Sequence, residues 1–123
     1  MNIEEKLRNI PQIKGYVELL QKEYNNYFDM LEMMKKINSE SSQKLEKLMN
    51  NIYNEIQQEL DEYKTTLAAV KQLSDFKQML IHFHYFDKKP LKQISEMMNY
   101  KYSFLYDTKI SALKDLENIL SKR

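Results

Sequence analysis

The chain has 123 residues, of which 42% are hydrophobic and 30% charged, and its formal net charge is +1. This length fits one domain, or one small domain with a helical extension, and the composition is that of a globular protein rather than a disordered one. The chain contains no cysteine, which excludes disulfides, thiolate catalysis and cysteine-based metal sites.

The residue types favour helices over sheets. One Gly and two Pro leave little turn chemistry for strands, whereas Leu, Lys, Glu, Gln and Met are abundant and are good helix formers. No apolar run approaches the roughly 18 residues that span a bilayer, and the N-terminus lacks a basic segment followed by an apolar stretch. We therefore predict an all-α fold in a soluble, cytoplasmic protein with no membrane partner.

The first half of the chain predicts a short helix followed by two long ones. The segment "NIEEKLRNIP" should form a short helix that ends at Pro11, because proline removes a helix hydrogen bond. Apolar residues then recur every three or four positions, as on one face of a helix: Ile13, Val17, Leu20, Tyr24, Tyr27, Leu31 and Met34. After the polar break "INSESSQ", whose side-chain oxygens can cap a new helix, a second stripe follows: Leu45, Leu48, Ile52, Ile56, Leu60, Tyr63, Leu67 and Val70.

These two stripes predict that residues 1–73 form one N-terminal helical region. Two helices that each expose an apolar stripe should fold back on each other as an antiparallel hairpin, since burying apolar surface is worth roughly 25 cal/mol per Å². The same seam would also serve a homodimer or the docking of another protein, because its heptad-like spacing is that of a coiled coil. We expect core packing or oligomerisation from this stripe rather than a ligand site.

The second half, residues 74–123, predicts three further helical elements. Ser74 can cap the segment "DFKQMLIHFHYF", which ends at the charged turn "DKK". Pro90 then stands where the first turn of a helix tolerates proline, and this helix should stop at Asn99, which readily adopts the left-handed conformation. The last helix runs from Tyr102 to about Leu120, and its inward face holds Leu105, Ala112, Leu116 and one of Ile119 and Leu120.

The spacing within the last two helices is that of a helix-turn-helix. Small Ser95 stands between Ile94 and Met98, where two helices must cross closely. Asn99 follows Ser95 by four residues, and Leu105 follows Asn99 by six. A plain bend between two packed helices remains an alternative interpretation of this pattern.

The stretch "LIHFHYFDKKPLKQISEMMNYKYSFLYDTKISALKDL" resembles region 4 of bacterial sigma factors. It is more similar to the phage late-gene transcriptional regulators of the RinA and ArpU type, which share the sigma-like helix-turn-helix. The similar motifs are "HYF", "QISEMMNY", "SFLY" and "SALKDL", in that order, and they fall within about residues 60–120. The resemblance implies a phage or prophage protein that binds double-stranded promoter DNA in a bacterial host cell and activates late genes. Host RNA polymerase or another phage protein is the further partner that it implies.

Carried over to this chain, the resemblance places DNA-reading residues at the start of the last helix: Lys101, Tyr102, Ser103, Tyr106 and Lys109. Their side chains can bond base edges or phosphates. Three lysines at the preceding turn and helix would contact the DNA backbone, namely Lys88, Lys89 and Lys92.

Charge leaves a second interpretation open. Residues 1–73 carry ten basic and twelve acidic residues, whereas residues 74–123 carry nine and six, so the basic excess lies in the second half but is small. Asp107 also places a negative charge on the face that would enter the groove. The alternative is therefore a non-enzymatic protein-interaction module of a phage or mobile element that lacks DNA binding.

Catalytic and metal-binding patterns are sparse. His82 and His84 are two residues apart, so on a helix they point to different faces, and we expect one against the core and one at the surface. No glycine-rich phosphate loop or nucleophile motif stands in the sequence. We predict no enzyme activity, no catalytic residue, no metal site and no cofactor.

Overall fold

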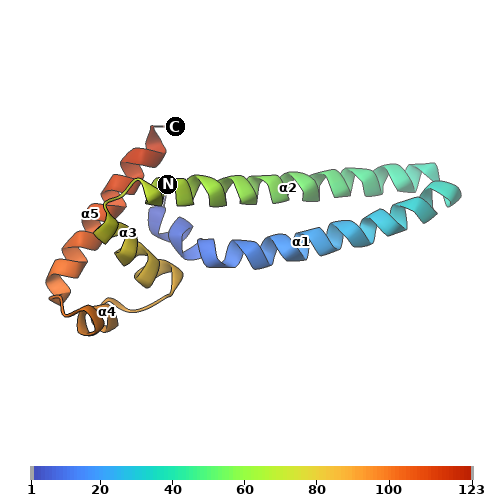
Figure 1. Cartoon of the computed structure of the whole chain (residues 1–123). Coiled ribbons are helices and arrows are strands. Elements are labelled where there is room, and N and C mark those ends of the chain that lie inside the picture. The colour runs from blue at the N-terminus through green and yellow to red at the C-terminus, as the bar shows by residue number, and fades with distance from the viewer. Residues whose placement is uncertain (1, 123) are drawn as a thin grey trace. The chain divides into compact units, whose positions relative to one another are not determined.

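A computed structural model describes residues 2–122 of the chain, except for the side chain of Ser39. The fold is all-α, as the composition predicts, and the described residues contain no strand. In chain order the elements are α1 (Ile3–Ile37), α2 (Ser39–Lys71), α3 (Asp75–Ile81), the π-helical segment η1 (His82–Phe86), α4 (Leu91–Met98) and α5 (Tyr102–Ser121) (Figure 1).

The helices group into two compact units. One unit is the middle of the chain, Gln12–Glu62, and the other combines Met1–Pro11 with Tyr63–Arg123. The first turns of α1 and the last turns of α2 therefore belong to the same unit as the C-terminal helices. The domain boundary predicted at residue 73, where the second apolar stripe ends, stays a prediction. The boundary between the two compact units falls about ten residues earlier, at Tyr63.

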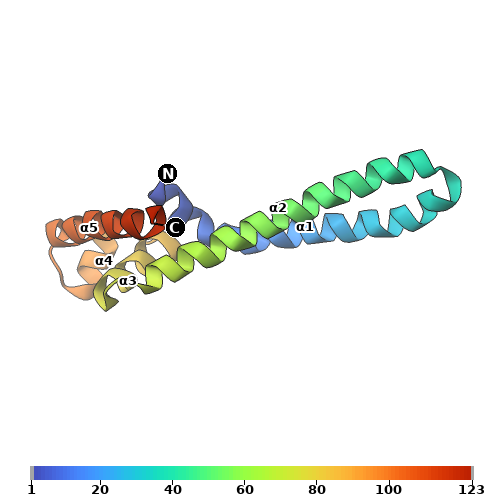
Figure 2. The same ribbon diagram turned by 90° about the horizontal axis from the view of Figure 1, so that it is seen from above.

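The unit of residues 12–62 is an antiparallel helical hairpin, with α1 and α2 side by side (Figures 1 and 2). All seven residues of the predicted α1 stripe are buried or half-buried. Leu20 packs with Ile52 and Ile56, and Leu31 packs with Leu45 nearer the turn. The apolar stripe of α1 is thus covered by residues of the same chain, and the long N-terminal helix pair is confirmed.

One position of the predicted α2 stripe was wrong. Leu48 is exposed, and Met49 is buried in its place beside Leu31 and Leu45. The spacing from Leu45 through Met49 to Ile52 is four and then three, whereas the predicted spacing through Leu48 was three and then four. Both spacings fit one helix face, so the contact with α1 decides between them.

The hairpin turn is a single residue, Asn38, between two long helices. Its side-chain oxygen accepts hydrogen bonds from the backbone N–H groups of Glu40 at 3.0 Å and Ser41 at 3.2 Å. Its carbonyl accepts the N–H of Ser42 at 3.1 Å. Asn38 is therefore the cap that starts α2, in agreement with the capping role expected for this polar segment.

The predicted stop at Pro11 was wrong, because α1 continues through this residue. Proline inside a helix costs about 3 kcal/mol, since one hydrogen bond is lost and the ring crowds the preceding turn. Leu7 and Ile10 before it and Ile13 after it are all buried. Burial on both sides outweighs the local cost, and Pro11 becomes the boundary between the two compact units rather than the end of a helix.

The second unit has two adjoining groups of buried side chains. Ile3 and Leu7 of α1 pack with Val70 of α2 and with Ala112 and Leu116 of α5. The other group joins the short helices and is made of Leu80, Leu91, Ile94 and Leu105, with Phe76, Phe83 and Met98 packed against it. The start of α1 thus belongs to the same core as α5.

The predicted helix that follows Ser74 is confirmed in its extent, but its second part is a π-helix and not an α-helix. Residues 75–81 are α-helical and residues 82–86 continue as a π-helix, which ends at Asp87. Ser74 precedes the helix without a side-chain capping bond.

No helix of residues 2–122 is apolar over a length that would cross a membrane.

Candidate nucleic-acid interface

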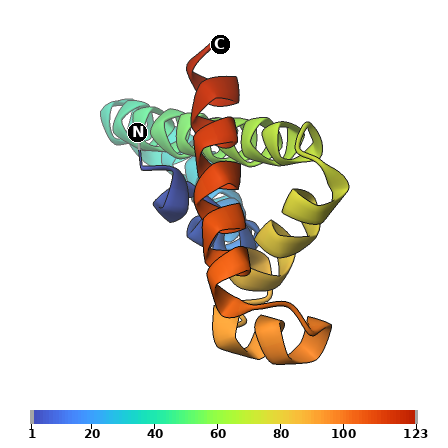
Figure 3. The ribbon, with the colours of Figure 1, turned by 90° about the vertical axis from the view of Figure 1, so that its left-hand side faces the viewer.

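Three residues separate α4 from α5, and Figure 3 shows the two helices meeting at this short turn. Asn99 adopts the left-handed conformation with φ 60° and ψ 43°, as its position predicts. The carbonyl of Ser95 accepts the N–H groups of Asn99 and Tyr100, and the Ser95 hydroxyl donates to the carbonyl of Tyr100. Small Ser95 therefore closes the turn.

Core packing decides which face of α5 is free. Leu105 is fully buried against Ile94 of α4 and Leu80 of α3. Further along, Ala112 and Leu116 face the other group of core residues. Residues on the opposite side of α5, above all in its first two turns, remain in solvent.

Four of the five predicted DNA-reading residues lie on this free surface. Lys101, Tyr102, Ser103 and Tyr106 are all exposed. Lys101 precedes the helix in an extended conformation, and its carbonyl accepts the N–H of Leu105 at 3.1 Å. Its side chain is exposed, so the ammonium group is accessible to an outside partner.

Lys109 does not share this surface. Its side chain is 14% exposed, its Nζ atom lies 4.0 Å from the Glu4 carboxylate, and it also lies near the faces of the Tyr85 and Tyr106 rings. Lys109 follows buried Leu105 by four residues, so it stands on the inward face of the helix. That relation was already present in the sequence and would have assigned Lys109 to the core side.

Aromatic side chains form a feature that the sequence interpretation missed. The rings of Tyr100 and Phe104 stack with centroids 5.6 Å apart, and Phe76 of α3 lies edge-on to Tyr100 at 5.2 Å. Tyr100 and Phe104 are nearly half exposed. The sequence could have indicated the exposure of Phe104, because it directly precedes buried Leu105 and neighbouring residues of a helix point in different directions.

The three predicted backbone-contacting lysines follow the π-helical segment. Lys88 is exposed and has a positive φ of 57°, and Lys92 is exposed on the first turn of α4. Lys89 is half-buried, with its ammonium group 5.1 Å from the centre of the Phe83 ring. Lys88 and Lys92 are therefore free to meet a phosphate, whereas Lys89 partly covers an aromatic face.

The two histidines divide as expected, His82 being exposed and His84 half-buried. His84 Nδ1 lies 2.9 Å from the carbonyl of Lys89, which fixes the turn before α4. Burial lowers the pKa of His84, and the positive charge of Lys109 lowers it further, against the opposing hydrogen bond to Lys89.

Next to His84 lies a buried tyrosine in a charged surrounding. Tyr85 is 2% exposed, and its hydroxyl has no hydrogen-bond partner among the described residues. Burial, followed by the nearby Glu4 carboxylate, raises the pKa of Tyr85. The guanidinium of Arg8, which pairs with Glu4 at 2.8 Å, lies 5.9 Å from the Tyr85 ring centre. These contacts tie the first turns of α1 to the π-helix.

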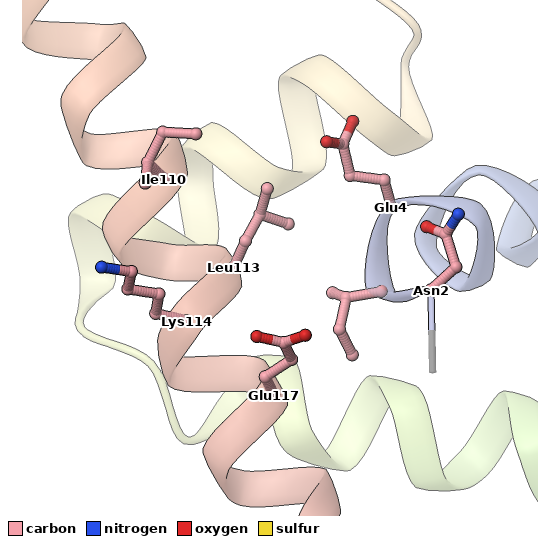
Figure 4. Close-up of a pocket in the computed structure, with 7 residues that line it drawn as sticks. Asn2, Glu4, Ile110, Leu113, Lys114 and Glu117 are labelled. Atoms are coloured by element: carbon pink, nitrogen blue, oxygen red, sulfur yellow. The ribbon is translucent and has the colours of Figure 1, made fainter.

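A shallow pocket of about 520 Å³ lies between the start of α1 and the middle of α5. Figure 4 shows Asn2 and Glu4 on one side and Ile110, Leu113 and Glu117 on the other. The pocket is lined by the carboxylates of Glu4 and Glu117 and by the ammonium group of Lys114, so it has no excess of positive charge for a phosphate backbone. It is set apart from the exposed start of α5.

Comparison of the chain with models of known protein families, with curated proteins and with solved structures finds no match in any of the three. The functional conclusion therefore depends on the arrangement and chemistry of the residues described above.

Proposed function

We propose that the chain binds double-stranded promoter DNA through α4, the turn and α5, as a transcriptional regulator of a phage or prophage. The sequence resemblance to phage late-gene regulators supports this proposal and suggests that the regulator is an activator. Host RNA polymerase or another phage protein would then be its partner at the promoter.

The observation that carries the proposal is the tight junction between α4 and α5. A three-residue turn with left-handed Asn99, closed by Ser95, is followed by a 20-residue helix whose first two turns expose the side opposite Leu105 to solvent. A helix presented in this way can enter a major groove with its N-terminal residues at the base edges, while the preceding helix crosses the backbone.

The roles proposed for the exposed residues follow from their chemistry. Lys101 can bond a guanine acceptor or a phosphate, and the hydroxyls of Ser103 and Tyr106 can bond phosphates or base edges. Lys88 before α4 and Lys92 on its first turn supply sequence-independent contacts to phosphates. Lys109 is left out of this set because it is turned toward Glu4.

A second candidate function is protein binding by the same surface. Its support is the number of large apolar side chains exposed around the turn: Met97, Tyr100, Tyr102, Phe104 and Tyr106. A concentration of exposed aromatic residues is typical of protein interfaces, and Asp107 would repel phosphates. In that case α5 would contact another protein, and DNA would not be a ligand.

Fluorescence anisotropy with the full chain separates the two functions. The probes are labelled duplexes that tile the genomic neighbourhood of its gene, each titrated at two salt concentrations. A regulator binds one tile well above the others and more weakly at the higher salt, because phosphate contacts release counterions. Equal, weak binding to every tile at low salt favours the protein-binding function instead.

A further inference from the structure

The hairpin of residues 12–62 carries a second apolar stripe that its own packing leaves uncovered. Met30, Met33 and Ile37 stand at spacings of three and four in the last turns of α1, which ends at Ile37. They are 44%, 60% and 82% exposed, whereas the neighbouring stripe that contains Leu31 is packed against α2. One helix therefore presents two adjacent apolar faces, and only one of them is used within the hairpin.

Charged residues beside this stripe match a second copy of the same helix. Asp29 comes directly before Met30, and Lys36 comes directly before Ile37, so both flank the stripe on the same side. Both are exposed, and neither forms an ion pair within residues 2–122. They are seven residues apart on one helix, too far to pair with each other.

Antiparallel packing would bring these charges together between two copies. When two identical helices meet about a twofold axis at the level of Glu32 and Met33, Asp29 of each copy lies opposite Lys36 of the other. In the same register, Met30 of one copy lies between Met33 and Ile37 of the other. The interface is self-complementary, as a twofold contact requires, with two ion pairs beside an interleaved apolar seam.

We propose that the chain forms a homodimer in which α1 packs antiparallel against α1 of a second copy through Met30, Met33 and Ile37, with Asp29 and Lys36 paired across the twofold axis. This dimer does not depend on the proposed DNA binding, because its residues all lie in the hairpin unit.

Sedimentation equilibrium of the full chain over a wide concentration range tests the dimer. The wild-type protein should associate reversibly to a dimer, and the double change Met30→Glu and Met33→Glu should leave it monomeric with unchanged helical circular dichroism. Phe28→Glu is the matched control, because Phe28 is also exposed but lies about 200° around the helix from Met30. A wild-type monomer at the highest concentration, or equal disruption by Phe28→Glu, overturns the proposal.

Charge reversal tests the register without touching the apolar stripe. Asp29→Lys and Lys36→Asp should each weaken the homodimer roughly tenfold, because each puts two like-charge pairs in place of two ion pairs. A mixture of the two variants should recover wild-type affinity, since every pair across a mixed dimer is again of opposite charge. Failure of the mixture to recover overturns the antiparallel register.

Discussion

The Ser95 hydroxyl donates to the carbonyl of Tyr100, and the Ser95 carbonyl accepts the N–H of the same residue at 3.3 Å. A residue of the last turn of α4 and a residue of the loop are thus joined in both directions. The arrangement holds Asn99 in the left-handed conformation between them. The orientation of α5 relative to α4 depends on this small junction.

Replacing Asn99 tests how much the turn contributes. Asn99→Ala should lower the free energy of unfolding by about 1 kcal/mol, because alanine is strained at φ 60°. Asn99→Gly should stay close to wild type, since glycine enters this conformation freely. Urea unfolding followed by circular dichroism measures both, and equal stability of the two variants would argue against a conformational cause.

The buried and exposed sides of α5 can be compared at neighbouring residues. Leu105→Ala should cost about 2 to 5 kcal/mol of unfolding free energy, because Leu105 is fully buried among Ile94 and Leu80. Phe104→Ala should cost clearly less, since Phe104 is half exposed and its ring lies at the surface against Tyr100 and Phe76. The same urea experiment would contradict this packing if Phe104→Ala were the more damaging change.

The imidazole of His84 should make stability depend on pH. Its pKa is lowered in the folded state, chiefly by burial, so the unfolded chain takes up the proton first as pH falls. The contribution to stability is present above the ordinary histidine pKa of about 6.5 and is lost as pH falls from there toward the folded pKa. Unfolding free energies of the wild type and His84→Gln, measured at several values between pH 7.5 and 5.5, should converge toward the acid end. Parallel curves would show that His84 is not responsible.

The cap at Asn38 predicts a graded response in the hairpin. Asn38→Ala should destabilise it by about 1 kcal/mol, because the N–H groups of Glu40 and Ser41 lose their acceptor. Asn38→Asp keeps an acceptor oxygen and should retain most of the stability. Hydrogen exchange of the amides in the first turns of α2 reports the effect locally, and unchanged protection in Asn38→Ala would contradict the capping role.

Helix positions and core faces follow from local patterns, which is why much of this fold was predictable. The α1 stripe from Ile13 to Met34 and the stop of α4 at Asn99 each depend on residue spacing or on one residue's conformational preference. Leu48 and Met49 were confused because both fit a helical spacing, and contact with α1 selects between them. Pro11 was misjudged because burial of Leu7 and Ile13 outweighs a local cost.

The candidate site was predictable only in part, because it depends on contacts between distant segments. Exposure of Ser103 and Tyr106 follows from the burial of Leu105 on the same helix. Lys101 and Tyr102 stand four and three residues before Leu105, so local spacing alone would have placed them on its side, yet both are exposed. The packing of Ile3 and Leu7 against α5, which brings Glu4 to Lys109, joins residues about a hundred positions apart. No local spacing reports such a contact.

The salt dependence of binding tests the central claim, that the start of α5 contacts DNA, most directly. Affinities of the wild type and Lys101→Ala for the preferred duplex are measured by anisotropy over a range of salt concentrations. We predict that Lys101→Ala weakens binding and, if Lys101 meets a phosphate, reduces the slope of log affinity against log salt by about 1. If it meets a guanine, discrimination at one base pair is lost instead. An unchanged affinity, slope and base preference would contradict the account.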